Sequence, residues 1–271
     1  MNKFSPFVRR FRSAVPCLLC VLLLATAGCD KIKSPDFSRT PNPRPAHQQA
    51  NHLPRLAIII DDVGSDPAAA DEIFVLSYPL TLSVLPNHPH STQIAEEAHR
   101  RGYQVMLHLP MESQANEAPE AQELRIGMNT TDVARTLDEM LRSVPYAKGV
   151  NNHQGSRATS DPHLMAELMP LLRVRNLFFV DSRTTSATVA YDAAERDGVR
   201  SAFRNVPFLD DVQQEAAIRH QLELAIRGAQ EKGEAIVIGH PHPETLRVLR
   251  EVLPHVQSQS VQLVYVSSLV H

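Results

Sequence analysis

Two adjacent carboxylates, Asp61 and Asp62, directly follow the apolar run 57–60. A short, uninterrupted apolar run is typical of a strand buried on both faces, as in a parallel sheet covered by helices. Two neighbouring carboxylates at the end of such a strand are costly to bury unless something compensates their charge, and a metal ion commonly does so. The pair therefore predicts a cation site. Because successive side chains on a strand face opposite ways, both can reach one site only if the backbone turns sharply after Ile60.

Histidines and a further aspartate follow the later apolar runs in the same manner. If the strands are parallel, their carboxyl ends lie along one rim, and polar residues placed there come together. The residues expected at this rim are Asp61, Asp62, His88, His90, His108, His153, Asp181, His240 and His242. Four further histidines, His99, His163, His220 and His255, fall within or at the start of predicted helices, where we expect them to be solvated.

This set of residue types suits hydrolysis at a metal ion. Such a site needs three protein ligands and one open position, which one Asp and two His can supply. A second carboxylate can then accept a proton from water, and a neighbouring His can protonate the leaving group. The chain's three cysteines all lie within the first 29 residues, so metal ligands beyond them must be His and carboxylate.

Short apolar runs alternate with helical patterns along the rest of the chain. The predicted strands are 56–60, 80–85, 103–107, 149–151, 177–180, 199–203, 235–238 and 263–266. The predicted helices are 66–76, 91–101, 130–142, 162–172, 186–196, a long helix capped by Asp210 or Asp211 and ended by Gly233, and 243–253. This alternation predicts an α/β fold with a parallel sheet. Seven to eight mainly parallel strands with polar ends favour a distorted (β/α) barrel over a doubly wound sheet. No dinucleotide or P-loop fingerprint follows any strand.

The first 29 residues predict a signal peptide. A basic start precedes the apolar segment 17–28, which is too short to span a bilayer. The sequence Ala-Thr-Ala-Gly-Cys that ends at Cys29 resembles a bacterial lipobox, which implies a lipid anchor at Cys29. Asp30 resembles the signal that retains enteric lipoproteins in the inner membrane. An uncleaved anchor is the alternative, and both place the domain outside the cytoplasm. We expect a periplasmic protein held at the inner membrane rather than the outer membrane.

Residues 30–54 contain five prolines among polar residues, which indicates a semi-rigid linker. The remaining 55–271 is long enough for one sizeable domain. The formal net charge is −3, from 27 basic and 30 acidic residues, and this near balance argues against a nucleic-acid partner.

Several of the strand-end motifs resemble those of a known family. Ile60-Asp61-Asp62-Val63-Gly64, the segment 102–108 ending in His108, and Ile238-Gly239-His240 resemble motifs of the polysaccharide deacetylase proteins (NodB-like, carbohydrate esterase family 4). The segments 107–112, 149–156 and 180–185 are similar to the divergent polysaccharide deacetylase branch of bacterial envelope proteins. The resemblance covers about 56–266. It implies a distorted barrel that holds one divalent, zinc-type ion and removes an N- or O-acetyl group from an envelope carbohydrate.

The resemblance also implies roles for single residues. By motif position, Asp61 would be the catalytic base and His240 the catalytic acid, while Asp62 and His108 would bind the metal. The family takes its second histidine ligand four residues after the first, and this chain has Glu112 at that position.

Pro110 lies between His108 and Glu112, which argues against a helical pair of ligands there. We expect His153 to be the replacement ligand. Asp181 and Arg183 are expected either to contact the substrate or to form a structural ion pair beneath the site.

Three functions are compatible with this pattern. The leading hypothesis is a metal-dependent carbohydrate deacetylase. The alternative is a catalytically inactive envelope lipoprotein of the same fold that binds glycan or a cell-wall partner. A metallo-phosphoesterase is less favoured, because a two-metal site needs more carboxylates than this rim offers. The absence of Trp argues against a long, tightly held glycan.

Overall fold

The structure is a computed structural model that describes residues 53–114 and 119–271. The predicted signal peptide, with Cys29, and the predicted linker up to residue 52 lie outside the described residues. Among the helices of the described part, none has the length and apolar character needed to cross a membrane.

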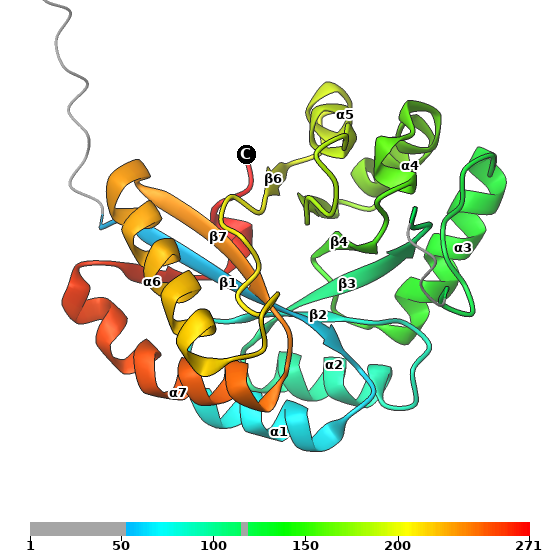
Figure 1. Cartoon of the computed structure of the whole chain (residues 1–271). Coiled ribbons are helices and arrows are strands. Elements are labelled where there is room, and N and C mark those ends of the chain that lie inside the picture. The colour runs from blue at the N-terminus through cyan, green and yellow to red at the C-terminus, as the bar shows by residue number, and fades with distance from the viewer. Residues whose placement is uncertain (1–52, 115–118) are drawn as a thin grey trace, which may run out of the picture. The chain divides into compact units, whose positions relative to one another are not determined.

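One parallel sheet of eight strands forms the centre of the domain, in the order β6-β5-β4-β3-β2-β1-β7, with β8 paired to β1. The strands are β1 (Arg55–Val63), β2 (Thr81–Val84), β3 (Gln104–Met111), β4 (Gly149–Gln154), β5 (Phe178–Asp181), β6 (Ser201–Phe203), β7 (Glu234–Gly239) and β8 (Gln262–Val264). The sheet curls into a half-barrel with helices on its outer side (Figure 1). The expected α/β architecture with seven to eight parallel strands is confirmed.

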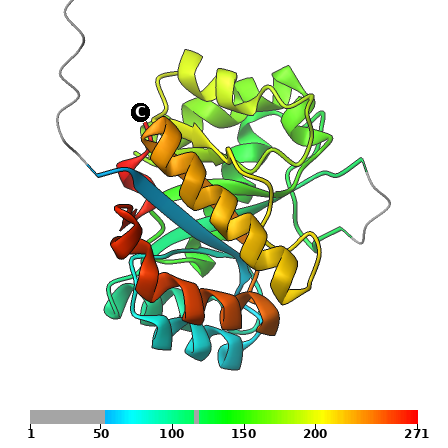
Figure 2. The same ribbon diagram turned by 60° about the vertical axis from the view of Figure 1, so that its left-hand side comes forward.

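The helices that follow the strands cover the outer face of the sheet. They are α1 (Pro67–Leu76), α2 (Ser91–Arg100), α3 (Thr130–Ser143), α4 (Pro162–Val174), α5 (Ala190–Arg196), α6 (Glu215–Lys232) and α7 (Pro243–Val256). In Figure 2, α6 and α7 lie beside one another on the outer side of β1. Alternate strand residues such as Leu56, Ile58 and Ile60 pack against these helices in the larger hydrophobic core.

The opposite face of the sheet lines the inside of the curl in two layers. The lower layer is apolar: Ala57 and Ile59 of β1 pack with Met106, Phe178 and other strand residues, and with the C-terminal residues from Val266 onward. Towards the carboxyl ends of the strands the inward side chains become polar. Those of the upper layer are Asp61, Ser83, His108, Asn151 and Ser182, all buried. The apolar layer thus forms a floor beneath a buried polar group of residues at the carboxyl ends of the strands.

The gap between β6 and β7 is bridged without a regular strand pair. Backbone N–H groups of Asn205 and Leu209 donate to the carbonyl oxygens of Ile236 and Ile238 at 3.2 and 2.9 Å. The segment 205–209 therefore joins the two edges of the sheet beside the polar layer. The expectation that Asp210 or Asp211 caps the long helix is wrong, because α6 begins at Glu215 with Gln214 at its N-cap. Asp210 ends the bridging segment instead.

Candidate metal centre and active site

A bulge in β1 brings both Asp61 and Asp62 to the site. The register against β2 slips between Ile60 and Val63, where three residues of β1 span two of β2. Asp62 has φ 55°, a left-handed conformation that Asp tolerates better than most residues and that typifies strand bulges. Asp61 keeps the inward direction set by Ala57 and Ile59, and the turn at Asp62 redirects its carboxylate towards the same space. The expected sharp turn after Ile60 is confirmed.

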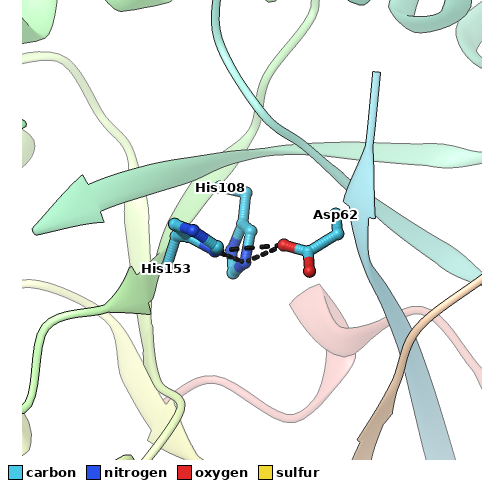
Figure 3. Close-up of side chains that lie close together, drawn as sticks. All are labelled: Asp62, His108 and His153. Carbon is cyan, nitrogen blue, oxygen red and sulfur yellow. Dashed lines mark hydrogen bonds and ion pairs between the residues drawn. The ribbon is translucent and has the colours of Figure 1, made fainter. Parts of the chain in front are cut away.

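Asp62, His108 and His153 converge on one point from three strands (Figure 3). Nε2 of His108 lies 3.2 Å from Oδ1 of Asp62, and Nδ1 of His153 lies 3.0 Å from the same oxygen. The two imidazole nitrogens are 3.1 Å apart. These three residues are the ones that the sequence predicted as metal ligands, and the structure brings one ligand atom of each to a common centre.

Oδ1 of Asp62 is a buried oxygen with no hydrogen-bond partner. Nδ1 of His108 lies 2.9 Å from Oδ1 of Asn151, an acceptor, so the proton of the neutral ring sits on Nδ1 and Nε2 presents a lone pair to Asp62. Electron pairs of a carboxylate and an imidazole facing one another at this distance repel unless a cation or a proton lies between them. One carboxylate oxygen and two imidazole nitrogens form a donor set that suits a zinc-type ion. The residues present therefore fit a single divalent metal.

The opposite charges of this cluster favour the ionised form of both Asp62 and His108. Burial opposes ionisation of Asp62, but the imidazoles of His108 and His153 outweigh it and hold the pKa of Asp62 well below its usual range. Burial disfavours the imidazolium of His108, yet the nearby carboxylates of Asp61 and Asp62 raise its pKa above the ordinary value. The carboxylates and imidazoles of this cluster therefore favour positive charge at its centre, which a divalent ion would supply.

Asp61 lies beneath this cluster as a buried carboxylate. It is 1% exposed, and its Oδ2 is 3.7 Å from Nε2 of His108. The side-chain amide of Asn151 donates to both of its oxygens, at 2.9 and 3.1 Å. Burial raises the pKa of Asp61 above its ordinary value, more than the nearby histidines and the amide lower it. A carboxylate with a raised pKa beside a candidate metal site is suited to accept a proton.

His240 approaches the site from the end of β7. Its Nε2 is 3.8 Å from Oδ2 of Asp62, and its Nδ1 is 2.9 Å from Oδ1 of Asp210. The other oxygen of Asp210 accepts from the backbone N–H of His240 at 2.7 Å and from the hydroxyl of Thr245 at 2.8 Å. Burial lowers the pKa of His240, but the bond to Asp210 and the nearby carboxylates outweigh it and raise it to about 9. His240 is therefore held as a proton donor pointing at the cluster.

We expect Asp210→Asn to lower the pKa of His240 by about 1 to 3 pH units, because it removes the carboxylate partner of the imidazolium. In the unaltered, metal-free protein the ring should keep its proton until the pH rises through about 9. In the variant the proton should be lost at lower pH, nearer the ordinary value of 6.5. NMR titration of the His240 ring measures both midpoints, and equal midpoints would show that Asp210 does not set the charge of His240.

The remaining rim histidines lie around the cluster without joining it. His88 contacts the hydroxyl of Ser65 at 2.6 Å and a carboxylate oxygen of Glu120 at 3.3 Å. The other oxygen of Glu120 is 3.8 Å from Nε2 of His153, so Glu120 stands on the outer side of that ligand. His242 lies beside His240 and contacts Gln213 at 3.0 Å.

Asp181 and Arg183 do not form an ion pair with each other in the described part of the chain. Asp181 is fully buried, and its two oxygens accept from the backbone N–H of Arg183 and the hydroxyl of Thr188, each at 2.8 Å. The exposed guanidinium of Arg183 instead stacks on Phe203, 3.4 Å from the ring centre. Asp181 thus holds the loop after β5. Substrate contact by these two residues stays a prediction.

Glu112 lies outside the metal cluster. Its carboxylate pairs with Arg157 at 3.0 Å and accepts from the backbone N–H of Ile126 at 2.9 Å. Strand β3 continues through Pro110 to Met111, which carries Glu112 past the site. Glu112, at the position of the family's second histidine ligand, therefore connects two loops in this chain.

Three residues of the site were not predicted from the sequence. They are Asn151, which contacts Asp61 and His108; Asp210, which holds His240; and Arg204, whose side chain donates to the carbonyl oxygens of Ser182, Arg183 and Val206. Arg204 ties the loop after β5 to the segment that bridges the sheet edges. A signal was present for Asn151, which lies two residues before His153 and so on the same face of β4. Asp210 and Arg204 lie in irregular segments, where no periodicity indicates direction.

Comparison with known families assigns the class of protein that this fold and site define. The model of the family described as "Divergent polysaccharide deacetylase" matches residues 58–270. The match covers nearly the whole described domain, and the chain belongs to the divergent polysaccharide deacetylase family. The Escherichia coli (strain K12) protein YibQ, itself uncharacterized, is 40% identical over 217 residues, which are 80% of this chain and 67% of YibQ.

Solved structures share the fold. An uncharacterized protein from Agrobacterium tumefaciens C58 superposes with a TM-score of 0.74 at 21% identity, over 82% of this chain and 91% of that one. The catalytic domain of a peptidoglycan N-acetylglucosamine deacetylase from Eubacterium rectale superposes with a TM-score of 0.52 at 14% identity, over 79% of this chain and 89% of that one. At these identities the likeness shows the fold alone, and it confirms the expected deacetylase-like architecture.

Proposed function

We propose that this protein is a metal-dependent hydrolase that removes acetyl groups from an envelope carbohydrate. The observation that carries the proposal is the buried Oδ1 of Asp62, which has no hydrogen-bond partner while ring nitrogens of His108 and His153 face it at 3.2 and 3.0 Å. Membership of the divergent polysaccharide deacetylase family supports the reaction class.

Asp62, His108 and His153 would hold the ion. When bound, a divalent ion supplies Lewis-acid chemistry, polarising a carbonyl group and making a water molecule more acidic. Asp61 and His240 both lie within 4 Å of an atom of the ligand cluster, at 3.7 and 3.8 Å. The site thus pairs a candidate base and a candidate acid around one centre.

Proton movement follows from the environments of Asp61 and His240. In its ionised form Asp61 can accept the proton of the attacking water, for which its raised pKa is an advantage. The bond to Asp210 and the nearby carboxylates favour the protonated form of His240, which gives its proton to the departing nitrogen or oxygen of the sugar. Asp210 holds the ring during both steps. Activity should therefore fall at high pH as His240 loses its proton.

The proposed substrate is an acetylated glycan, and the test is acetate release. We expect the purified domain 55–271, loaded with zinc, to release acetate from at least one member of a panel of N-acetylated and O-acetylated glycans. A chelator should stop the release, and added zinc should restore it. Stoichiometric zinc without acetate release from any member would instead favour the alternative, a domain of this fold that binds glycan without cleaving it.

The proposed location is the periplasmic side of the inner membrane, with the domain attached through a lipid at Cys29. Support comes from the sequence around Cys29 and Asp30. Metabolic labelling with a palmitate analogue tests the attachment. The label should be incorporated into the full chain and lost in Cys29→Ser, and equal labelling of both would exclude Cys29 as the anchor.

A further inference from the structure

Asn151 is a buried amide that contacts both halves of the proposed catalytic centre. It lies on β4, two residues before His153, and is completely buried. Its Nδ2 donates to both oxygens of Asp61 at 2.9 and 3.1 Å, and its Oδ1 lies 2.9 Å from Nδ1 of His108. One planar group therefore links the candidate base to a candidate metal ligand.

The contacts of Asn151 allow only one orientation of its amide. Nδ2 of Asn151 lies within hydrogen-bond distance of both oxygens of Asp61, so the NH2 group faces Asp61 and the carbonyl oxygen faces His108. The hydroxyl of Ser83 donates to the same carbonyl oxygen, while the hydroxyl of Ser182 accepts from Nδ2 at 3.2 Å. In the flipped amide the carbonyl oxygen would face the carboxylate of Asp61, with repulsion between two acceptors in a buried site.

This orientation determines which nitrogen of His108 is free. A carbonyl oxygen beside Nδ1 can only accept, so Nδ1 carries the ring proton and Nε2 presents its lone pair to Asp62 and His153. If Nδ1 lost this acceptor, the ring proton could move to Nε2, where it would block the ligand position. The amide of Asn151 thus specifies the tautomer of a metal ligand on the neighbouring strand.

We propose that Asn151 is the positioning residue of this site, which selects the metal-binding tautomer of His108 and holds Asp61 beside it. The proposal rests on the proposed metal site but not on the reaction. Outer partners that orient a ligating histidine commonly contribute 10- to 100-fold to metal affinity. We therefore expect Asn151→Ala to weaken zinc binding by about 10- to 100-fold, although none of its atoms touches the ion.

The neighbouring Asn152 offers a matched control. It is 1% exposed, lies on the same strand and points to the other face, where its amide donates to the carbonyl oxygen of Gln154 at 2.8 Å and accepts from the N–H of Ser182 at 2.9 Å. Asn152→Ala removes a buried amide of the same size from the same strand. We expect it to lower the melting temperature while leaving zinc affinity within about threefold of the unaltered protein.

Two measurements test the proposal on the domain 55–271. Competition with a chromophoric chelator gives the zinc affinity, and long-range 1H–15N NMR of the zinc-loaded protein shows which ring nitrogen of His108 carries the proton. We expect Nδ1–H in the unaltered protein and in Asn152→Ala, and loss of a single defined tautomer in Asn151→Ala.

Asn151→Asp provides a second variant in case Asn151→Ala does not fold. It keeps an acceptor for Nδ1 of His108 but places a second acceptor against Asp61. We expect it to retain zinc affinity within about threefold and to lose acetate release. Zinc affinity and an Nδ1–H tautomer both unchanged in folded Asn151→Ala, or an equal loss of affinity in Asn152→Ala, would overturn the proposal. Failure of every protein to release acetate would refute the proposed reaction and leave these results standing.

Discussion

Asp62→Ala and His153→Ala should each abolish stoichiometric metal binding. We expect the unaltered domain to hold about one divalent ion per chain and each variant to hold less than about a tenth of that after dialysis. The reason is geometric, because Oδ1 of Asp62 and Nδ1 of His153 lie 3.0 Å apart and face the same centre as His108. Removal of either leaves two ligands, too few for a tightly held zinc-type ion. Elemental analysis of the dialysed proteins measures the content.

His163→Ala is the matched control for a lost imidazole, because His163 is an exposed residue of α4 outside the cluster. It should keep the metal content and melting temperature of the unaltered domain. Full retention of the metal in both Asp62→Ala and His153→Ala would refute the proposed ligands. Retention in one of them alone would remove that residue from the ligand set.

Asp61→Asn should reduce acetate release by about 10²- to 10⁴-fold, the usual contribution of a general base, while the metal stays bound. Asn has the size of Asp but cannot accept the proton of the attacking water. The carboxylate is buried beside the cluster without contributing an atom to its common centre, so its loss should change zinc affinity much less than the loss of Asp62. Initial rates at saturating zinc, with zinc affinity measured in parallel, give the two effects separately.

Asp161→Asn is the control for the loss of one carboxylate. Asp161 caps α4 by accepting from the N–H of Leu164 at 2.7 Å, and Asn serves equally well at that position. Its acetate release should stay within about twofold of the unaltered domain. If Asp61→Asn were as active as Asp161→Asn, Asp61 could not be the base. A different outcome, in which neither the unaltered domain nor any variant releases acetate while all bind glycan, would identify the domain as a binding protein.

The fold was predictable from the sequence because its elements carry strong local signals. Continuous apolar runs such as 57–60 identify strands buried on both faces. Asp66 and Asp161 cap the helices whose first residues are Pro67 and Pro162. Helix α6 shows the limit. Asp210 has a side chain suited to capping a helix, but its carboxylate binds His240, which directly follows β7 later in the chain. No local pattern encodes that contact.

The candidate ligands were predictable in identity but not in arrangement. Polar residues that directly follow predicted strands meet at one rim, which grouped nine candidates without coordinates. The family resemblance then singled out Asp62 and His108 as ligands, with His153 in place of the missing second histidine. The bulge that turns Asp62 towards the same space as Asp61 has no sequence signature beyond Gly64, and φ 55° at Asp62 emerged only from the structure. The role of Asn151 could not be predicted for another reason: its amide contacts partners on β1 and β3 that are distant in sequence.

Anomalous diffraction at the zinc edge, from crystals of the domain 55–271 grown with one equivalent of zinc, tests the metal centre most directly. We expect one dominant peak within about 2.0 to 2.2 Å of Oδ1 of Asp62, Nε2 of His108 and Nδ1 of His153. A fully occupied zinc elsewhere on the chain, with these three atoms still facing one another around an empty centre, would contradict it.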